Sequence, residues 1–256
     1  MPELPEVETI VQALRPRVEG RTLLSLEVLD PRLSPGRLPR LPAPVTRLGR
    51  RGKYILFELP SEVVVVHLRM SGRLLWAEEP PPGRLRAALS FEAGAVYLVD
   101  RRRLATLEVV DEFRKELGPE PFGDLGWLSQ ALKGSRMPIK SWLMDQRKIA
   151  GIGNIYASEI LFRAGIDPRR PAGSLSPREA RRLAEVIPRV LRAAIAGKGT
   201  TLSDAEYRLP TGEPGGFQLE LAVYGRAGAP CPRCGTPIQR LKIAGRSTYF
   251  CPRCQR

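Results

Sequence analysis

The chain begins with a stretch that combines an amine with two carboxylates, Met1-Pro2-Glu3-Leu4-Pro5-Glu6. If an aminopeptidase removes the initiator Met1, the chain starts at the secondary amine of Pro2, with Glu3 and Glu6 close behind it. An α-amino group titrates near ~7.7–8 and a lysine amine near ~10.4, so far more of the terminal amine is unprotonated at neutral pH. An unprotonated amine can attack an electron-poor carbon and form an imine. This stretch therefore offers a nucleophile together with its acid and base.

The same residues also have a purely structural interpretation. Glu3 and Glu6 are spaced i, i+3, Pro5 suits the first turn of a helix, and acids in that turn favour the helix dipole. Apolar residues recur at intervals of three and four and predict a helix with one buried face. They are Leu4, Val7, Ile10, Val11, Leu14 and Val18. From this stretch alone both interpretations remain open, and the structural one is favoured.

The region from Thr22 to about Val110 predicts strands. Short segments rich in β-branched or aromatic residues alternate with Pro or Gly clusters. They are Thr22–Leu29, Tyr54–Leu59, Val63–Leu68, Arg73–Trp76, Ala87–Phe91 and Ala95–Val99. This pattern predicts an antiparallel sandwich with the N-terminal helix packed on it. The single histidine, His67, follows an apolar run, and we expect it to be a satisfied core residue.

Loops of this region carry cations next to strands. Lys53 follows Arg50-Arg51-Gly52 just before a strand, where it suits either a phosphate contact or a solvated turn. Met70 and Leu104 each lie beside arginines at the end of a strand. An apolar side chain among cations is typical of a wedge between base steps of DNA. It is also typical of an ordinary loop anchor, which the residues alone favour.

After the linker-like Leu117–Pro121 the pattern becomes helical. It predicts helices over Pro138–Arg147 and Ile155–Ala164, with a glycine-flexed turn between them. Asn154 stands directly before the second helix, where its side-chain oxygen would cap backbone N–H groups. A helix N-terminus after such a turn can bind an anion, and Lys140 adds charge nearby. A plain capped helix has the same pattern, so this site also stays open.

A further helix is predicted to start at Ser176-Pro177-Arg178-Glu179, which has the serine, proline and glutamate of a capping box. The segment Gly197–Gln218 after that helix is polar and rich in glycine and acids. It is too long for a simple connection. Loops of this kind are usually functional lids or disordered.

The four cysteines form two Cys-Pro-Arg-Cys motifs, Cys231–Cys234 and Cys251–Cys254, with 16 residues between them, 235 to 250. This spacing fits the two-knuckle zinc pattern. Four thiolates close a tetrahedral site, so we expect one structural, non-catalytic Zn²⁺ per chain. Between the knuckles, Pro237–Ile243 and Ser247–Phe250 would pair as a hairpin and hold Arg246 outward at its tip.

The charge balance points to a polyanionic partner. The chain has 41 Lys+Arg against 27 Asp+Glu, a formal net charge of +14 and a sequence pI near 10.3. Such a balance most often means nucleic acid. An apolar run of about 18 residues and a charged-then-apolar leader are both missing, so we expect an unexported, cytoplasmic protein without membrane contact. Disulfides are then disfavoured. An RNA- or protein-binding zinc ribbon is an alternative that uses only the finger and the charge.

In their order along the chain, these motifs resemble the formamidopyrimidine-DNA glycosylase family. The resemblance covers essentially the full chain. It rests on Pro-Glu-Leu-Pro-Glu-Val-Glu-Thr, Arg-Gly-Lys-Tyr, His-Leu-Arg-Met-Ser-Gly, Asp-Gln-Arg-Lys-Ile-Ala-Gly-Ile-Gly-Asn-Ile-Tyr-Ala-Ser-Glu and the four-cysteine finger. It implies a multidomain α+β fold: an N-terminal helix with an antiparallel β-sandwich, a helical domain with a helix-two-turn-helix motif, and a zinc-ribbon β-hairpin. The expected limits are 1–118 for the catalytic domain, 119–127 for a linker, 128–224 for the helical domain with a lesion-capping loop at about 199–218, and 225–256 for the zinc finger.

The resemblance implies a bifunctional DNA glycosylase and abasic-site lyase of base excision repair. Pro2 would attack C1′ of a damaged nucleoside flipped out of the duplex, Glu3 would act as general acid and base, and Glu6 would help to position it. Loss of the base leaves an iminium, and β- and δ-elimination then cut the strand on both sides. The partner would be double-stranded DNA with an oxidised base or an abasic site, bound by a monomer.

Other positions match residues that hold DNA in this family. The phosphate-gripping positions are Lys53, Asn154 and Arg246, with Lys140 nearby. The positions that fill the gap left by the flipped nucleotide are Met70, Arg102 and Leu104, with Arg103 beside them. Such fillers partly offset the few kcal/mol that flipping costs.

Two departures from the family pattern bear on the substrate. The third filler of the purine-specific branch is normally phenylalanine in Arg-Arg-Phe-Gly, whereas this chain has Leu104, and a histidine usual after Glu-Pro-Pro is replaced by Arg86. Leucine fills space but cannot stack as a ring does. Thr201–Gln218, with its Pro-Gly-Gly-Phe, resembles the loop that caps 8-oxoguanine, so oxidised purines are expected. The alternatives are a Nei-like enzyme for oxidised pyrimidines, mainly an abasic-site lyase, or, more distantly, a non-catalytic damaged-DNA-binding protein.

Overall fold

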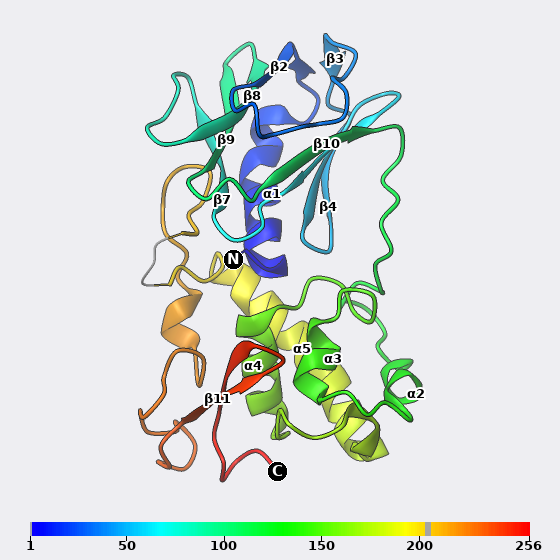
Figure 1. Ribbon diagram of the computed structural model, residues 1–256, viewed down its shortest axis with the longest axis vertical. Coiled ribbons are helices and arrows are strands. Elements are labelled where there is room, and N and C mark those ends of the chain that lie inside the picture. The colour runs from blue at the N-terminus through cyan, green and yellow to red at the C-terminus, as the bar shows by residue number, and fades with distance from the viewer. Residues whose placement is uncertain (1, 203–205) are drawn as a thin grey trace. The chain divides into compact units, whose positions relative to one another are not determined.

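The structure, a computed structural model, describes residues 2–202 and 206–256, so Met1 and residues 203–205 of the expected capping loop lie outside it. The chain divides into two compact units, residues 1–115 with 195–218 and residues 116–194 with 219–256 (Figure 1). The segment 195–218 thus groups with the N-terminal unit. The domain limits given above stay predictions.

In its described residues, the first unit forms the helix α1, two four-stranded antiparallel sheets and a two-stranded one, together with the last residues of α5 (Pro177–Ala196). Its elements are α1 (Leu4–Val18), β1 (Thr22–Leu23), β2 (Ser25–Val28), β3 (Ala43–Pro44), β4 (Arg47–Arg51), β5 (Tyr54–Glu58), β6 (Val63–His67), β7 (Gly72–Ala77), β8 (Leu85–Phe91), β9 (Gly94–Asp100) and β10 (Thr106–Val110). The sheet orders are β10-β6-β5-β4 and β2-β8-β9-β7, which confirms the predicted sandwich. The strand expected over Thr22–Leu29 is divided, because β1 pairs with β3 whereas β2 pairs with β8.

Helix α1 forms where the apolar period predicted it. The six apolar residues of the expected face are at most 1% exposed, which confirms that face. From Val7 onward they share one core cluster with Leu48 of β4 and Leu98 of β9. The start of the helix, and with it Pro2 and Glu3, is therefore fixed to the core of the unit.

The second unit is helical and ends in a hairpin. Its elements are α2 (Leu128–Leu132), α3 (Ile139–Met144), α4 (Asn154–Ala164), the 3₁₀ turn η1 (Ala172–Ser174), most of α5 (Pro177–Ala196), β11 (Gln239–Ile243) and β12 (Arg246–Phe250); the 3₁₀ turn η2 (Phe217–Glu220) spans the division. The helix expected over Pro138–Arg147 is shorter, because Asp145 takes extended backbone. The predicted capping box is present, since Glu179 Oε2 accepts the Ser176 N–H at 2.8 Å and Ser176 Oγ accepts the Glu179 N–H at 3.3 Å.

Two expectations for this unit need correction. The prediction that Asn154 caps α4 is wrong: Gly153 is the N-cap and Asn154 is the first helical residue. Arg246 was expected in the hairpin tip, but it pairs with Ile243 as the first residue of β12 (red in Figure 1). It is exposed there. Within the two described ranges, no helix is long and apolar enough to cross a bilayer.

Candidate functional site

The two N-terminal carboxylates are enclosed at the start of α1. Glu3 and Glu6 are each 1% exposed, and Pro2 is also buried. Glu3 is the N-cap, and the two residues form a reciprocal capping box in which the Glu3 N–H donates to Glu6 Oε2 at 2.8 Å. The other oxygen of Glu6 accepts the Thr200 N–H at 2.8 Å. Glu6 thus joins the chain start to the base of the long loop after α5.

The base of that loop is built closely around Glu6. Gly199 has φ +77, and a Cβ there would lie 3.0 Å from Glu6 Oε1 and 3.0 Å from a Tyr207 ring carbon, so only glycine fits. The Tyr207 hydroxyl donates to the Lys198 carbonyl at 3.0 Å. Burial, followed by the charge of Glu6, raises the pKa of Tyr207, so its phenol stays protonated. Sequence reasoning missed Thr200 and Tyr207, because nothing local to them indicates a carboxylate nearly 200 residues away.

Lys53 and His67 lie at neighbouring strand ends. Lys53 occupies the turn between β4 and β5 and is 7% exposed. Burial first, and then the positive charges of Arg69 and Lys53, lower the pKa of His67 to about 3. The neutral imidazole accepts the Arg69 N–H on Nδ1 at 3.0 Å. The prediction that His67 is a satisfied core residue is confirmed.

The two loops with expected filler residues are tight turns that follow strands. The first lies between β6 and β7, where Arg69 has φ +53 and the Gly72 N–H donates to the Leu68 carbonyl at 2.9 Å. It carries the half-buried Met70. The second lies between β9 and β10, where Arg103 has φ +58 and Leu104 is 40% exposed. Both turns belong to the first unit and present an apolar side chain next to arginines.

Lys140 of the second unit is enclosed rather than displayed. It is 1% exposed, and its ammonium donates to Asn154 Oδ1 at 2.6 Å, Ser247 O at 2.9 Å and Thr248 Oγ1 at 2.8 Å. The ammonium therefore connects the first turn of α4 to β12. Lys140 was predicted to add positive charge near the start of α4 and to bind DNA; in the structure its ammonium faces three protein acceptors, and its role at DNA stays a prediction.

A second buried charge in this unit was not anticipated. Glu159 of α4 is fully buried, and its carboxylate accepts three successive backbone N–H groups at 3.0, 2.9 and 2.9 Å, from Ala222, Val223 and Tyr224. It thereby fixes the segment that leads to the cysteines. A glutamate in the middle of a helix gives no signal of such a role in the sequence.

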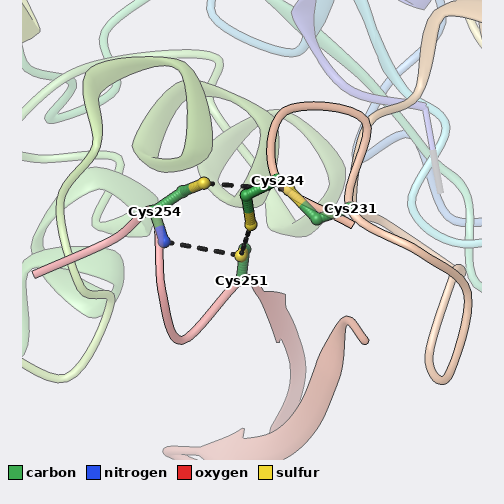
Figure 2. Close-up of side chains that lie close together, drawn as sticks. All are labelled: Cys231, Cys234, Cys251 and Cys254. Atoms are coloured by element: carbon green, nitrogen blue, oxygen red, sulfur yellow. Dashed lines mark hydrogen bonds between the residues drawn. The ribbon is translucent and has the colours of Figure 1, made fainter. Parts of the chain in front are cut away.

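The four cysteines converge as predicted (Figure 2). Their sulfur atoms all lie within 4.8 Å of one another, with Cys231 and Cys254 at 3.9 Å and Cys234 and Cys251 at 3.5 Å. A tetrahedral zinc with Zn–S bonds of about 2.3 Å has sulfurs about 3.8 Å apart. All four are free cysteines. The set fits Zn²⁺, and four protein ligands leave no open position for substrate, so the site is structural.

Three family models match the chain in order. They are the formamidopyrimidine-DNA glycosylase N-terminal domain at residues 1–107, the formamidopyrimidine-DNA glycosylase H2TH domain at residues 117–205, and a zinc finger found in FPG and IleRS at residues 228–256. Together they match most of both units described above, including the N-terminal carboxylates and the cysteines.

Full-length relatives agree with these matches. The formamidopyrimidine-DNA glycosylase of Thermus thermophilus is 46% identical over 272 residues, covering 100% of this chain and 98% of that protein. The one from Sodalis glossinidius is 44% identical over 276 residues, with 100% of each covered. Among solved structures, MutM from T. thermophilus matches with a TM-score of 0.89 at 45% identity, covering 99% of this chain and 98% of that one. Lactococcus lactis Fpg bound to DNA with an abasic site matches with a TM-score of 0.90 at 33% identity, covering 99% of both. With its sandwich, helices and cysteine cluster all matched at these identities, the chain belongs to the formamidopyrimidine-DNA glycosylase family.

Proposed function

We propose that Pro2, which becomes the chain terminus once Met1 is removed, is the nucleophile and that Glu3 is the general acid and base. Membership of the family makes the chain a DNA glycosylase with abasic-site lyase activity, so the proposal concerns the residues and the lesion. One observation carries it. Glu3 and Glu6 are both 1% exposed directly behind Pro2, and Glu6 is held by the N–H groups of Glu3 and Thr200.

The reaction follows from an amine beside a proton donor. The unprotonated nitrogen of Pro2 forms a bond to C1′, and the bond from C1′ to the damaged base breaks, so that the base leaves with the bonding electrons and takes up a proton. Glu3 protonates the sugar ring oxygen as the ring opens, which leaves an iminium between Pro2 and C1′. The iminium acidifies C2′–H. When a base removes the C2′ proton, the 3′-phosphate leaves, and a second elimination then expels the 5′-phosphate. Water finally hydrolyses the bond between Pro2 and the sugar and frees the enzyme.

Glu6 suits a positioning role rather than proton transfer. One of its oxygens accepts the Glu3 N–H and the other accepts the Thr200 N–H, both at 2.8 Å. These bonds fix the backbone of Glu3 relative to the loop after α5. A carboxylate that is held by two donors in a buried site keeps its geometry while its neighbour exchanges protons.

The favoured substrates are oxidised purines, 8-oxoguanine and formamidopyrimidines, in double-stranded DNA. Two observations support this class: the segment 206–218 folds back on Thr201, whose Oγ1 accepts the Gly215 N–H at 2.8 Å, and a similar L. lactis protein has been solved with Fapy-dG DNA. Oxidised pyrimidines are the second candidate. Leu104 stands where the purine branch has phenylalanine, and the L. lactis protein has also been solved with an oxidised pyrimidine.

The DNA contacts are divided between the units. We assign phosphate contacts to Lys53 in the first unit and to Asn154 and Arg246 in the second. Met70, Arg102 and Leu104 would fill the gap in the duplex, with Arg103 beside them. Lys140 would act through Asn154, since its ammonium already has three protein acceptors. The protein would bind damaged duplex as a monomer, with Zn²⁺ maintaining the hairpin.

A cleavage panel tests both the lesion class and the acid. Duplexes with 8-oxoguanine, formamidopyrimidine, thymine glycol or dihydrouracil are compared under single turnover. We expect faster cleavage of both purine lesions, and loss of base excision in Glu3→Gln. Glu8→Gln, on the same helix with a carboxylate that is 21% exposed and pairs with Arg50, is the matched control and should retain activity. Faster cleavage of the pyrimidine lesions would favour the second candidate, and a fully active Glu3→Gln would contradict the role of Glu3.

A further inference from the structure

Asp100, the last residue of β9, lies between the two turns that carry the filler residues. Its side chain is 0% exposed. Oδ1 accepts the Ser71 hydroxyl at 2.6 Å and the Arg102 N–H at 3.0 Å. Oδ2 accepts the N–H groups of Leu104 and Ala105, both at 2.6 Å. One carboxylate therefore holds the backbone of the second turn and, through Ser71, the residue next to Met70.

A second layer of charge surrounds this carboxylate. Arg86 of β8 is 1% exposed, and its guanidinium lies 3.7 Å from Asp100 Oδ2 and 2.8 Å from Asp30 Oδ2. Arg103 Nε lies 3.0 Å from the same oxygen of Asp30. The Arg86 contacts are close but poorly aligned as hydrogen bonds, so they act as charge attraction. Two arginines thus oppose two buried carboxylates.

Both carboxylates are ionised at neutral pH. Burial alone would raise the pKa of Asp100, but hydrogen bonds from Ala105, Ser71, Arg102 and Leu104 outweigh it and lower the pKa. The pKa of Asp30 is lowered by the Arg32 N–H and by the charges of Arg103 and Arg86. The anions beside the buried Arg86 guanidinium are thus the carboxylates of Asp30 and Asp100.

We infer that Asp100 is a positioning residue that holds Met70 and the Arg102–Leu104 turn in one arrangement, so that these side chains enter the duplex as a unit. The inference rests on the filler roles proposed above for Met70, Arg102 and Leu104. Asp100 itself contacts no DNA in this account. It binds backbone and one hydroxyl, which fixes the turns while the Leu104 side chain stays 40% exposed.

The arrangement explains why a carboxylate is needed at this position. All four groups that point at Asp100 from the turns are donors. An asparagine would turn its NH₂ group toward at least one backbone N–H and lose at least one hydrogen bond, because among the four donors only the Ser71 hydroxyl can reverse and accept. A fixed pair of turns also loses less conformational freedom on binding than two independent ones. The expected consequence is coupling between Met70 and Leu104.

A double-mutant cycle measures that coupling. Met70→Ala, Leu104→Ala and the double variant are compared for single-turnover excision of 8-oxoguanine, in the wild-type and in the Ser71→Ala background. In the wild type, we expect the fold loss in excision rate of the double variant to be smaller than the product of the two single losses, because either substitution alone already disturbs the joint insertion of both side chains. In Ser71→Ala, which lacks the bridge to Asp100, the losses should multiply. Multiplicative losses in both backgrounds would overturn the inference.

Asp100→Asn should reduce the excision rate more than Ser71→Ala does, because Asp100 holds both turns. Misplacement of a positioned group by about 1 Å can cost up to about 100-fold in rate, and we expect a loss in that range, with a reduced fluorescence rise of 2-aminopurine beside the lesion. Glu62→Gln, a buried carboxylate that pairs with Arg37, is the control and should retain both signals. Unchanged excision and fluorescence in a folded Asp100→Asn would contradict the inference.

If Asp100→Asn does not fold, the Ser71→Ala cycle decides. Single Met70→Ala and Leu104→Ala variants with unchanged excision would overturn the filler assignment itself, and the inference with it.

Discussion

Asp100 in the first unit and Lys140 in the second solve the same problem with opposite charges. Asp100 accepts four donors and is 0% exposed, whereas Lys140 gives three hydrogen bonds to acceptors and is 1% exposed. Each holds residues that we assign to DNA contact while contacting none itself. In both places, a buried ion with all its partners supplied defines the geometry of the exposed residues around it.

The difference lies in what each charge does to a polyanion. An exposed carboxylate beside the filler turns would repel phosphate, so Asp100 is usable only because it is enclosed and opposed by Arg86. An ammonium has the sign that DNA attracts, and Lys140 was assigned to the DNA surface for that reason. Because the acceptors of Lys140 are neutral, its removal leaves no buried charge unpaired. We therefore expect a smaller loss in the free energy of unfolding than when the ion cluster around Asp100 is broken.

The largest expected effect comes from breaking that cluster. Arg86→Met leaves Asp30 without its closest partner, at 2.8 Å, and removes the cation beside Asp100. Removing one member of a buried ion pair typically destabilises by about 3–5 kcal/mol, and we expect a loss of that size in the free energy of unfolding in urea. Arg84→Met, at an exposed position on the same segment, is the control. A loss no larger than that of Arg84→Met would show that the cluster is not essential to the first unit.

A smaller effect is expected for Lys140→Met. Lys140→Met removes three hydrogen bonds of about 1.5–3 kcal/mol each, but it also removes the desolvation cost of a buried ammonium, so we expect the free energy of unfolding to fall by about the value of one such bond. DNA affinity should fall because Asn154 and β12 are no longer held together, yet the salt dependence of binding should stay the same, since the Lys140 ammonium faces protein acceptors and is not one of the assigned phosphate contacts. Arg246→Ala, at an exposed position, should instead reduce the slope of log K against log salt by about 1. A similar reduction in Lys140→Met would make Lys140 a direct phosphate contact.

The smallest expected effect is a pH dependence of the free energy of unfolding, which should differ between the Asp100 and Lys140 variants. The folded pKa of Asp100 is lowered, so its stabilising contribution is fully present above the unfolded pKa, about 4, and is lost as pH falls through the folded pKa. The stability difference between wild type and Asp100→Asn should be constant at neutral pH and shrink in acid. The difference between wild type and Lys140→Met should not change over that range. Urea unfolding at pH 7 and pH 3 measures both, and a constant difference for Asp100→Asn would contradict the assigned ionisation.

Local patterns made much of the fold predictable. The buried face of α1, the antiparallel sandwich and the two cysteine pairs depend on spacings of a few residues, and the structure confirms them, whereas β3, β4 and β10 were not among the predicted strand segments. The boundaries were less predictable, since the division between β1 and β2 depends on which distant strand each one pairs with. Asn154 is not the cap because the helix begins one residue earlier than expected, and its side-chain oxygen accepts a hydrogen bond from Lys140.

The positioning residues could not be found in this way. Lys140 meets Ser247 and Thr248 from 107 and 108 residues away, and Asp100 meets Ser71 from 29 residues away. No period or motif in the sequence reports such pairings. Arg86 was visible only as a departure from the family pattern, and its meaning became clear once its burial beside Asp30 was known. Sequence reveals a reactive group more readily than the group that holds it in place.

The account depends most on the identity of the amine that joins the sugar. Borohydride added to the protein with an 8-oxoguanine duplex reduces the iminium and fixes the adduct, and peptide mass spectrometry then locates it. We predict a single adduct on the N-terminal peptide that begins at Pro2, and a weaker adduct in Pro2→Gly, whose terminus is a primary amine. An adduct on an internal lysine, or active protein that still carries Met1, would contradict the central claim.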